Sequence, residues 1–391
     1  MKPFDGVDFL ELDSLLTPSE IETRAKARAF TEAEILPIVG DCYERAEFPR
    51  ALVPKLAAAG YLGANLTGYG CAGLDETHYG LIMQELERGD SGIRTFCSVQ
   101  SALVMYPIFR FGSDEQKAHW LPRLSAGEAI GAFGLTEPDH GSDPSSMVTR
   151  ARRDGDGYVL DGGKKWIGNA TIADVAVIWA KTDDGTVGGF LVEKDTPGFE
   201  PSLITGKLSL RVPVTAEIRL EGCRVPAAAR LPGTAGLKSA LQCLTKARFG
   251  IGWGVIGAAM ACYHEAVGYA AERKQFGRPI GSFQLVQQKL VDMLTEITKM
   301  QLLTLQVSRL MQRGAATPVQ ISMLKRNNVA HALDIARAAR DLLGARGITL
   351  EHHSGRHMCN LEAVKTYEGT HDVHTLILGE HITGERAFAP R

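Results

Sequence analysis

The stretch Asp174-Val175-Ala176-Val177-Ile178-Trp179 (DVAVIW, residues 174–179) establishes the fold class and is the starting point for assigning the rest of the chain. Its β-branched and aromatic residues are typical of a strand. Comparable short runs, separated by turn formers, lie at 158–160, 189–192 and 216–220. Several short strands at this spacing predict a small β-barrel or sandwich over residues 131–237.

The segment before residue 131 carries helix start signals. Thr17-Pro18-Ser19-Glu20 has the N-cap, first-turn proline and closing glutamate of a capping box, and Ser113-Asp114-Glu115-Gln116 repeats this pattern with glutamine. A further helix is expected to end near Gly89. Residues 1–130 are therefore predicted to form an N-terminal helical domain.

The segment after residue 237 is again helical. Periodic patterns long enough for bundle helices lie at 251–275, 283–312, 319–343 and 370–386. Helices, then strands, then helices predict an α+β protein whose third domain, residues 238–391, is a helical bundle.

Composition excludes several classes of protein. The chain has 391 residues, and its 43 Lys and Arg against 45 Asp and Glu give a net charge of −2, which does not favour binding to nucleic acid or to anionic membranes. We find no run of 18 apolar residues and no signal peptide, so no membrane association is expected. The 7 cysteines are dispersed without a CxxC motif, which favours reduced thiols and a cytoplasmic location.

Two motifs suggest functions that the sequence does not otherwise favour. Residues 252–257 match G-x-G-x-x-G, but no strand precedes them, so close helix packing is a better interpretation than a dinucleotide site. His371 and His374, with His352, His353 and His357 nearby, raise the question of a metal. Their spacing matches no common zinc motif, and no metal site is predicted.

Three other segments carry polar groups suited to a ligand. The loop 133–143 (FGLTEPDHGSD) exposes backbone N–H groups, or is an ordinary surface turn. Trp166 could cover a flat aromatic cofactor or plug a barrel. Glu368 lies in the loop before a helix that Thr370 can cap. In an apolar pocket its pKa would rise, as suits a general base; the alternative is a solvated glutamate.

Taken in order, six motifs resemble the acyl-CoA dehydrogenase family of flavoproteins, and within it most closely the glutaryl-CoA dehydrogenase subgroup. They are ELERGDSG at 85–92 with Arg94, SVQS at 98–101, FGLTEPDHGSDPSS at 133–146, ARFGIGWG at 247–254, RKQFGRP at 273–279 and TYEGTHDVHTLILG at 366–379. The resemblance covers nearly the whole chain. It implies an N-terminal helical domain, a central β-domain and a C-terminal four-helix bundle, with FAD between the last two.

The resemblance also implies roles for individual residues. Those expected around FAD and the acyl-CoA are Phe133, Leu135, Thr136, Gly141, Ser142, Trp166 and Ile167, with Leu343, Gly344, Thr370 and Asp372 on the adenosine-diphosphate side. Arg273, Phe276 and Gln284 resemble residues that reach FAD from a neighbouring subunit, which implies a homotetramer built as a dimer of dimers.

The implied reaction is that of an FAD-dependent oxidoreductase. Glu368 would remove the α-proton of an acyl-CoA while the β-hydrogen leaves as hydride, and electrons would pass to an electron-transferring flavoprotein. Arg94, with Glu87 close by, would bind a terminal carboxylate, so the expected substrate is glutaryl-CoA, oxidised and decarboxylated to crotonyl-CoA. The other residues expected at the substrate are Thr95, Ser98, Ser142, Tyr367 and Arg248, the last on the CoA side.

Three departures from the family pattern leave alternatives open. Gly168 replaces a usual threonine, Pro213 lies in a changed 211–215 segment, and Leu343-Gly344-Ala345-Arg346-Gly347 replaces the usual Leu-Gly-Gly-x-Gly, which would put Cβ atoms or a charge near the cofactor phosphates. Space at Gly168 would suit a bulkier or branched acyl group without decarboxylation, or admit dioxygen as in an oxidase. A catalytically silent acyl-CoA-binding protein is the third possibility, and the presence of Glu368 argues against it.

Overall fold

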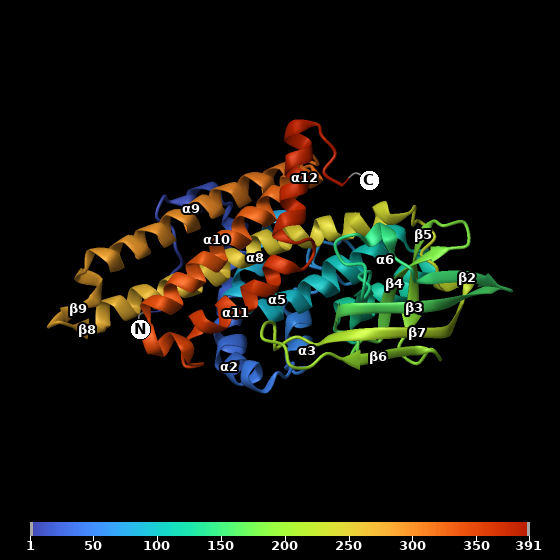
Figure 1. The fold of residues 1–391 in the computed structure, drawn as a ribbon, viewed down its shortest axis with the longest axis horizontal. Coiled ribbons are helices and arrows are strands. Elements are labelled where there is room, and N and C mark those ends of the chain that lie inside the picture. Colours follow the sequence, from blue (N-terminus) through green and yellow to red (C-terminus); the bar gives the residue numbers. More distant parts are fainter. Residues whose placement is uncertain (1–2, 389–391) are drawn as a thin grey trace.

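The computed structural model describes residues 3–388, which form helical, β and helical regions in that order (Figure 1). The N-terminal region holds short helices connected by loops and two π-helical turns at Thr31–Ile35 and Val99–Met105. Its helices are α1 (Pro18–Phe30), α2 (Leu36–Arg45), α3 (Leu52–Ala58), α4 (Glu76–Gly89), α5 (Ser91–Ser98), α6 (Tyr106–Phe111) and α7 (Asp114–Ser125). The capping boxes predicted at Thr17 and Ser113 are both confirmed, as is the helix end at Gly89.

The central region is one seven-stranded sheet with the order β1-β4-β2-β3-β7-β6 and with β5 paired to β4. Its strands are β1 (Gly131–Gly134), β2 (Arg150–Asp154), β3 (Gly157–Gly168), β4 (Val175–Thr182), β5 (Val187–Glu193), β6 (Phe199–Leu203) and β7 (Thr215–Pro226). The four predicted strands are confirmed. Other strands were not predicted because their composition is atypical of strands. β2 is highly charged, and β6 contains Pro201 at the edge of the sheet, where proline is tolerated.

Alternation along β4 explains how the sheet joins the rest of the molecule. Val175, Val177 and Trp179 pack toward α6 and α7, whereas Ala176 and Ile178 face the curled sheet's own core. A strand buried on both faces appears in the sequence as an uninterrupted apolar run, which is why DVAVIW is so apolar. β1 pairs with β4 and contacts the π-helical turn at Val99–Met105, so the loop that follows β1 begins between the sheet and the N-terminal helices.

The C-terminal region is built on the long helix α8 (Leu237–Glu272), which packs against α4 and α10. The others are α9 (Gln284–Gln312), α10 (Pro318–Leu342), α11 (His353–Thr366) and α12 (His371–Thr383), with the hairpin β8 (Lys274–Gln275) and β9 (Arg278–Pro279) between α8 and α9. None of the helices in residues 3–388 has the length and apolar character needed to cross a membrane.

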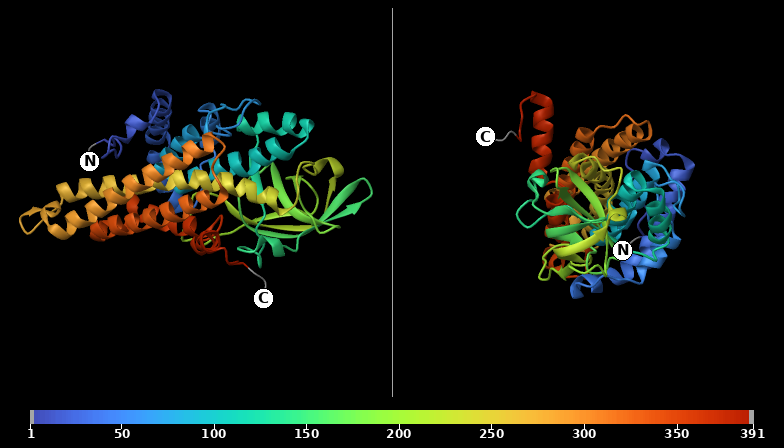
Figure 2. Two further views of the ribbon diagram at one scale, coloured as in Figure 1. Left: turned by 90° about the horizontal axis from the view of Figure 1, so that it is seen from above. Right: turned by 90° about the vertical axis from the view of Figure 1, so that its right-hand side faces the viewer.

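The fourth helix of the bundle is α11, not the predicted 370–386 segment. In Figure 2, α12 projects from the body of the molecule, whereas α11 lies along α8 and α10. The inward face of α11 is largely polar, with Arg356, His357 and Asn360 all buried, so it produced no apolar periodicity in the sequence. Arg356 and Asn360 both donate to Oδ2 of Asp90, which ties α11 to the start of α5.

The G-x-G-x-x-G motif lies within α8, as the helix-packing interpretation predicted. A Cβ at Gly257 would lie 1.8 Å from the carbonyl oxygen of Gln84, and a Cβ at Gly254 would lie 2.1 Å from Oε2 of Glu87. The two glycines therefore let α4 approach α8 closely. At Gly254 the missing side chain also makes room for the Glu87 carboxylate.

Candidate active site

Glu368 lies in the short loop between α11 and α12. Thr370 caps α12 by accepting a hydrogen bond from the Val373 N–H at 3.1 Å, as predicted. The backbone of Glu368 has a φ of 54°, a left-handed conformation that is uncommon for a residue with a side chain, and Gly369 follows with a φ of 89°. Oε2 of Glu368 is buried and has no hydrogen-bond partner among the described residues. The carboxylate is thus held in the interior by an uncommon backbone turn.

Cationic side chains surround this carboxylate. Burial raises the pKa of Glu368, while the charges of Lys325, Arg94 and Arg248 oppose the rise. Burial lowers the pKa of Lys325 to about 7, against the attraction of Glu368. A carboxylate whose pKa is raised is a stronger base than an ordinary glutamate, which suits the role of a general base.

Arg94 is fully buried on α5 and carries both bonded and free donors. Its Nε donates to Oε2 of Glu87 at 2.6 Å, and its Nη2 donates to the Tyr367 hydroxyl. Nη1 of Arg94 and Oε1 of Glu87 are buried without a partner in the described part of the chain. Leaving such a donor unpaired costs about 1–3 kcal/mol, so the arrangement favours a ligand with acceptor atoms.

The charges in this pocket are unequal. Arg94, Arg248 and Lys325 contribute three cations, whereas Glu87 and Glu368 contribute two carboxylates. His374 adds no charge, because burial and the charges of Lys325 and Arg248 lower its pKa to about 3. An excess of positive charge in a buried pocket favours an anionic ligand.

Polar groups near Arg94 extend the pocket. The Thr95 hydroxyl donates to the Ser91 carbonyl at 2.7 Å and lies 3.4 Å from the Tyr367 hydroxyl. Oγ of Ser98 is buried without a partner among the described residues. The structure therefore brings together five of the predicted substrate residues with the predicted base, namely Glu87, Arg94, Thr95, Arg248 and Tyr367 around Glu368, and Ser98 lies one helical turn after Arg94 on α5.

Gly168 lies at the end of β3 and faces α5 and the π-helical turn that follows it. A Cβ at this position would lie 3.5 Å from Cγ2 of Val99, which is an ordinary van der Waals contact. A Cβ could therefore be accommodated at this position without a clash. The extra room for substrate expected at Gly168 stays a prediction.

The loop after β1 is fixed by a buried ion pair. Oε1 of Glu137 accepts from Lys164 Nζ at 2.8 Å, and the carboxylate also accepts from the N–H groups of Val148 and Thr149 at 2.7 and 2.9 Å. Burial would raise the pKa of Glu137, but these hydrogen bonds outweigh it and lower the pKa to about 2. Glu137 thereby joins both ends of the segment that contains Gly141 and Ser142.

The predicted cofactor residues of the β-domain lie together. The Thr136 carbonyl accepts from the Lys165 N–H at 2.9 Å, which places the loop after β1 beside Trp166. Phe133, Leu135 and Ile167 are buried, whereas Gly141 and Ser142 are exposed. Trp166 has a φ of 64° and its side chain is 59% exposed. An indole held at the surface by an uncommon backbone conformation offers a flat face to a planar ligand, so these residues fit a flavin.

A second group of predicted cofactor residues lies at the opposite end of the molecule. The β8–β9 hairpin, with Arg273 and Phe276 beside it and Gln284 at the start of α9, is far from the sheet in Figure 1. Leu343 and Gly344 lie near this end, because Lys289 on α9 pairs with Asp341 on α10. Thr370 and Asp372 lie beside Glu368 instead. Within one chain these groups do not meet.

Sequence reasoning missed Lys325 and the Glu137–Lys164 pair. Lys325 lies in α10 between the buried residues Ile321, Leu324 and Val329, so a lysine on the apolar face of a predicted helix was the available signal. Lys164 is buried in β3 between the half-buried Gly163 and Lys165, and its polar surroundings in the sequence gave a weaker signal.

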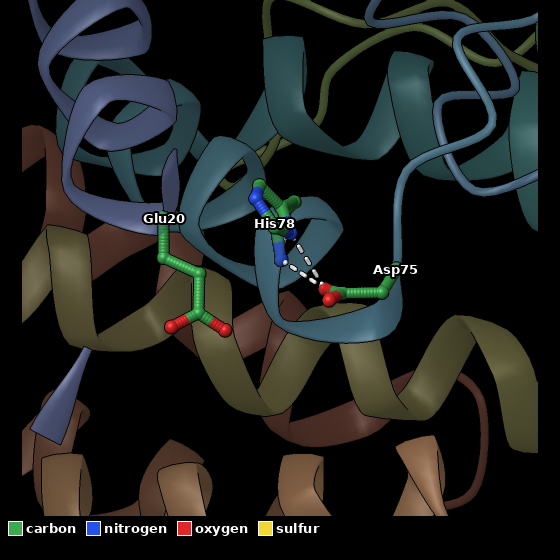
Figure 3. Close-up of side chains that lie close together, drawn as sticks. All are labelled: Glu20, Asp75 and His78. Carbon is green, nitrogen blue, oxygen red and sulfur yellow. Dashed lines mark hydrogen bonds and ion pairs between the residues drawn. The ribbon is translucent and has the colours of Figure 1, made fainter. Parts of the chain in front are cut away.

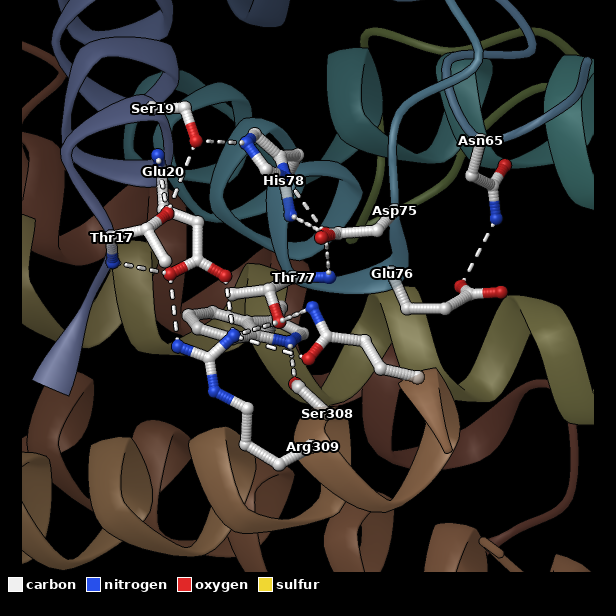
Figure 4. Close-up of polar contacts among 12 residues, drawn as sticks. Thr17, Ser19, Glu20, Asn65, Asp75, Glu76, Thr77, His78, Ser308 and Arg309 are labelled. Carbon is white, nitrogen blue, oxygen red and sulfur yellow. Dashed lines mark hydrogen bonds and ion pairs between the residues drawn. The ribbon is translucent and has the colours of Figure 1, made fainter. Parts of the chain in front are cut away.

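Within residues 3–388, one group of side chains is close enough to consider as a metal site: Glu20, Asp75 and His78 (Figure 3). Its ligand atoms are already used. The Glu20 carboxylate pairs with Arg309 and accepts from the Thr17 N–H, and Asp75 caps α4 and bonds His78 (Figure 4). The group joins α1, α4 and α9 as a structural contact.

Comparisons with known proteins agree along the whole chain. Family models described as the N-terminal, middle and C-terminal domains of acyl-CoA dehydrogenase match residues 17–128, 132–223 and 234–383. A glutaryl-CoA dehydrogenase from Mycobacterium smegmatis, solved in complex with FADH2, is 48% identical with a TM-score of 0.97 over 98% of this chain and 99% of that one.

More distant relatives carry other names. The human mitochondrial short-chain specific acyl-CoA dehydrogenase is 35% identical over 362 residues, covering 91% of this chain and 88% of its own. A 3-(aryl)acrylate reductase from Clostridium sporogenes is 34% identical over 365 residues, covering 92% of this chain and 97% of its own.

Proposed function

The chain belongs to the acyl-CoA dehydrogenase family, and from that membership we propose that its substrate is a dicarboxylic acyl-CoA, with glutaryl-CoA as the first candidate. The supporting observation is the buried Arg94, whose Nη1 has no partner among the described residues. A pocket for a plain fatty acyl chain would be apolar at this point, because burying the Arg94–Glu87 ion pair carries a desolvation cost and leaves the Nη1 donor without a partner.

The guanidinium of Arg94 is oriented so that it can bind a carboxylate. Glu87 and the Tyr367 hydroxyl fix the guanidinium through Nε and Nη2, which leaves Nη1 to donate to a substrate oxygen. A planar, oriented guanidinium binds a carboxylate more specifically than a lysine could. Arg248 and Lys325 add positive charge nearby, so the substrate carboxylate would restore balance in the pocket.

Glu368 is the proposed base. Its buried carboxylate would take the proton from the carbon next to the thioester, and its raised pKa brings its basicity closer to that of the activated substrate. FAD is the cofactor, and when bound it accepts the hydride that leaves the β-carbon. The residues that would hold its ring system are Trp166, Thr136 and Ser142.

Decarboxylation follows from the position of the second carboxylate. Loss of both hydrogens from glutaryl-CoA gives glutaconyl-CoA, in which the double bond is conjugated with the thioester. The bond to carbon dioxide then breaks, its electron pair enters the conjugated system, and protonated Glu368 returns its proton to give crotonyl-CoA. The proton is thus recycled, and the net products are crotonyl-CoA, carbon dioxide and two electrons with one hydrogen on the cofactor.

A homo-oligomer, specifically a tetramer, would complete the cofactor site. Phe276 is 93% exposed at the hairpin and Leu285 is 76% exposed on α9, and a neighbouring subunit would cover these apolar side chains. Arg273, Phe276 and Gln284 would then reach the FAD of a neighbouring copy. Reduced FAD would pass its electrons to an electron-transferring flavoprotein. We also propose a cytoplasmic location.

The deciding experiment is incubation of the holoenzyme with a panel of acyl-CoA esters and a dye acceptor, with the products identified by mass spectrometry. We expect glutaryl-CoA to lose two hydrogens and carbon dioxide. Turnover of butyryl-CoA with no reaction of glutaryl-CoA would contradict the proposed substrate.

The lack of a side chain at Gly168, where a Cβ would meet only Val99 within 4 Å, favours a second candidate, a bulkier or branched dicarboxylic acyl-CoA that is dehydrogenated without decarboxylation. In the same panel this candidate predicts faster turnover of branched or longer dicarboxylic esters than of glutaryl-CoA. Rapid reoxidation of the reduced flavin by air would instead indicate an oxidase.

A further inference from the structure

The peptide carbonyls of Tyr367, Glu368 and Gly369 are each bound by a cationic side chain. Nζ of Lys325 donates to the Tyr367 carbonyl at 2.5 Å and to the Gly369 carbonyl at 2.6 Å. Nε of Arg248 donates to the Glu368 carbonyl at 2.8 Å. Two helices, α8 and α10, therefore hold the loop that carries the base.

Lys325 is unusual because it places an amine in apolar surroundings, which disfavour its charge. It is 1% exposed on α10, where the neighbouring inward residues are apolar. Burying an ammonium is costly, and neither of its two hydrogen bonds goes to a carboxylate. A residue that only filled space at this position could be methionine or leucine.

The two carbonyls that Lys325 binds lie on either side of Glu368, the residue with the uncommon backbone conformation. Left-handed conformations of residues with side chains persist only where the surroundings enforce them. The Tyr367 carbonyl belongs to the peptide unit before Glu368, the Glu368 carbonyl that Arg248 binds belongs to the unit after it, and the Gly369 carbonyl belongs to the next unit. Lys325 and Arg248 together therefore restrain both backbone angles of Glu368, and these angles set the direction of its side chain.

We propose that Lys325 is a positioning residue of this active site, which keeps the Glu368 carboxylate aimed at the substrate by holding the carbonyls of Tyr367 and Gly369. The inference rests on the proposed role of Glu368 as base. The amine also acts on the carboxylate through its charge, since Lys325 is the first among the charges that favour ionised Glu368.

Several titratable and charged groups face Glu368 and Lys325 from the surrounding elements. They are Arg94 from α5, Arg248 from α8, Tyr367 from the end of α11, and His371 and His374 from α12. Arg94 and Arg248 keep their charge throughout the accessible pH range, so a change in the pH profile of a Lys325 variant would report on Lys325 and Glu368.

The test compares Lys325→Met, Lys325→Gln and Lys325→Arg in the FAD-loaded enzyme, with Arg326→Met as the matched control, since the neighbouring Arg326 donates to Thr375 on α12 and not to a carbonyl of the loop. We expect Lys325→Met to lower kcat for the best ester of the panel about 100-fold, with KM unchanged, because a misaimed base slows chemistry and not binding. Lys325→Arg, which keeps a cationic donor, should recover part of this loss.

The pH profile separates positioning from a merely structural role. Lys325→Met removes a charge that favours ionised Glu368, so the acid limb of kcat/KM should move to higher pH. An unchanged kcat and pH profile would overturn the proposal. If Lys325→Met does not bind FAD, Lys325→Gln takes its place, because its side chain is uncharged and one bond too short to reach both carbonyls; a wild-type kcat together with a wild-type acid limb in Lys325→Gln would then overturn the proposal.

Glu368→Gln is measured in parallel, so that failure of the proposed base can be distinguished from failure of the proposed positioning role. An active Glu368→Gln enzyme would refute the proposed base itself. An inactive Glu368→Gln enzyme beside a fully active Lys325→Met enzyme would refute only the positioning role.

Discussion

Nη2 of Arg94 donates a hydrogen bond to the hydroxyl of Tyr367, the residue immediately before Glu368. This bond joins the side chain proposed to bind the substrate carboxylate with the loop that carries the proposed base. One end of an acyl chain can therefore be held from α5 while the loop between α11 and α12 acts on the other end. The relationship determines how the variants below should behave.

Glu368→Gln should abolish bleaching of the flavin by substrate, with a loss of about 10³-fold or more in rate, because the amide cannot accept the α-proton. FAD should remain bound, since no predicted ring contact is removed. The measurement is stopped-flow absorbance of the flavin band. Bleaching at the wild-type rate would remove Glu368 as the base.

The rate should depend on pH through a group whose pKa lies above that of an ordinary glutamate. Burial raises the pKa of Glu368, so the carboxylate form required for proton abstraction is lost earlier as pH falls. The acid limb of kcat/KM should accordingly lie above pH 4.5, the usual pKa of a glutamate. FAD content measured across the same range is the control, and an acid limb at the ordinary position would contradict the buried setting of this carboxylate.

Gly168→Thr should fill the free volume next to Val99 without disturbing the fold. If the native substrate is glutaryl-CoA, the variant should keep its turnover of that ester and lose turnover of branched esters. Reoxidation by air in the same variant shows whether the space also admits dioxygen. If glutaryl-CoA turnover is lost and no other ester is turned over faster than by the wild type, the substrate itself occupies the space at Gly168.

Glu137→Gln should lower the free energy of unfolding by about 3 kcal/mol, because it leaves the Lys164 ammonium buried without its carboxylate. The thermal midpoint of the FAD-loaded protein measures the effect. Glu193→Gln, at the exposed end of β5, is the matched control and should change stability little. Equal midpoints for the two variants would contradict a structural role for the buried pair.

Much of the fold followed from local signals in the sequence. The capping boxes at Thr17 and Ser113 and the run at 174–179 specify their elements by nearest neighbours alone. Helix α11 was missed because its buried face carries Arg356, His357 and Asn360, which pack by tertiary hydrogen bonds that no periodicity can reveal. Glu368 and Arg94 were found through their motifs, whereas Lys325 acts on backbone carbonyls 42 and 44 residues away, a relationship that only the folded chain displays.

The most direct test of the account is the ratio of kcat/KM for glutaryl-CoA to that for pentanoyl-CoA, which has the same chain length and no terminal carboxylate, in the wild type and in Arg94→Ala. A Glu87→Gln/Arg94→Ala double variant removes the carboxylate that the single change would leave unpaired, and Arg326→Ala is the surface control. We predict that the wild type prefers glutaryl-CoA and that both Arg94 variants lose this preference by about 100-fold, while the pentanoyl-CoA rate falls far less. Equal losses for the two esters would show that Arg94 does not bind a substrate carboxylate.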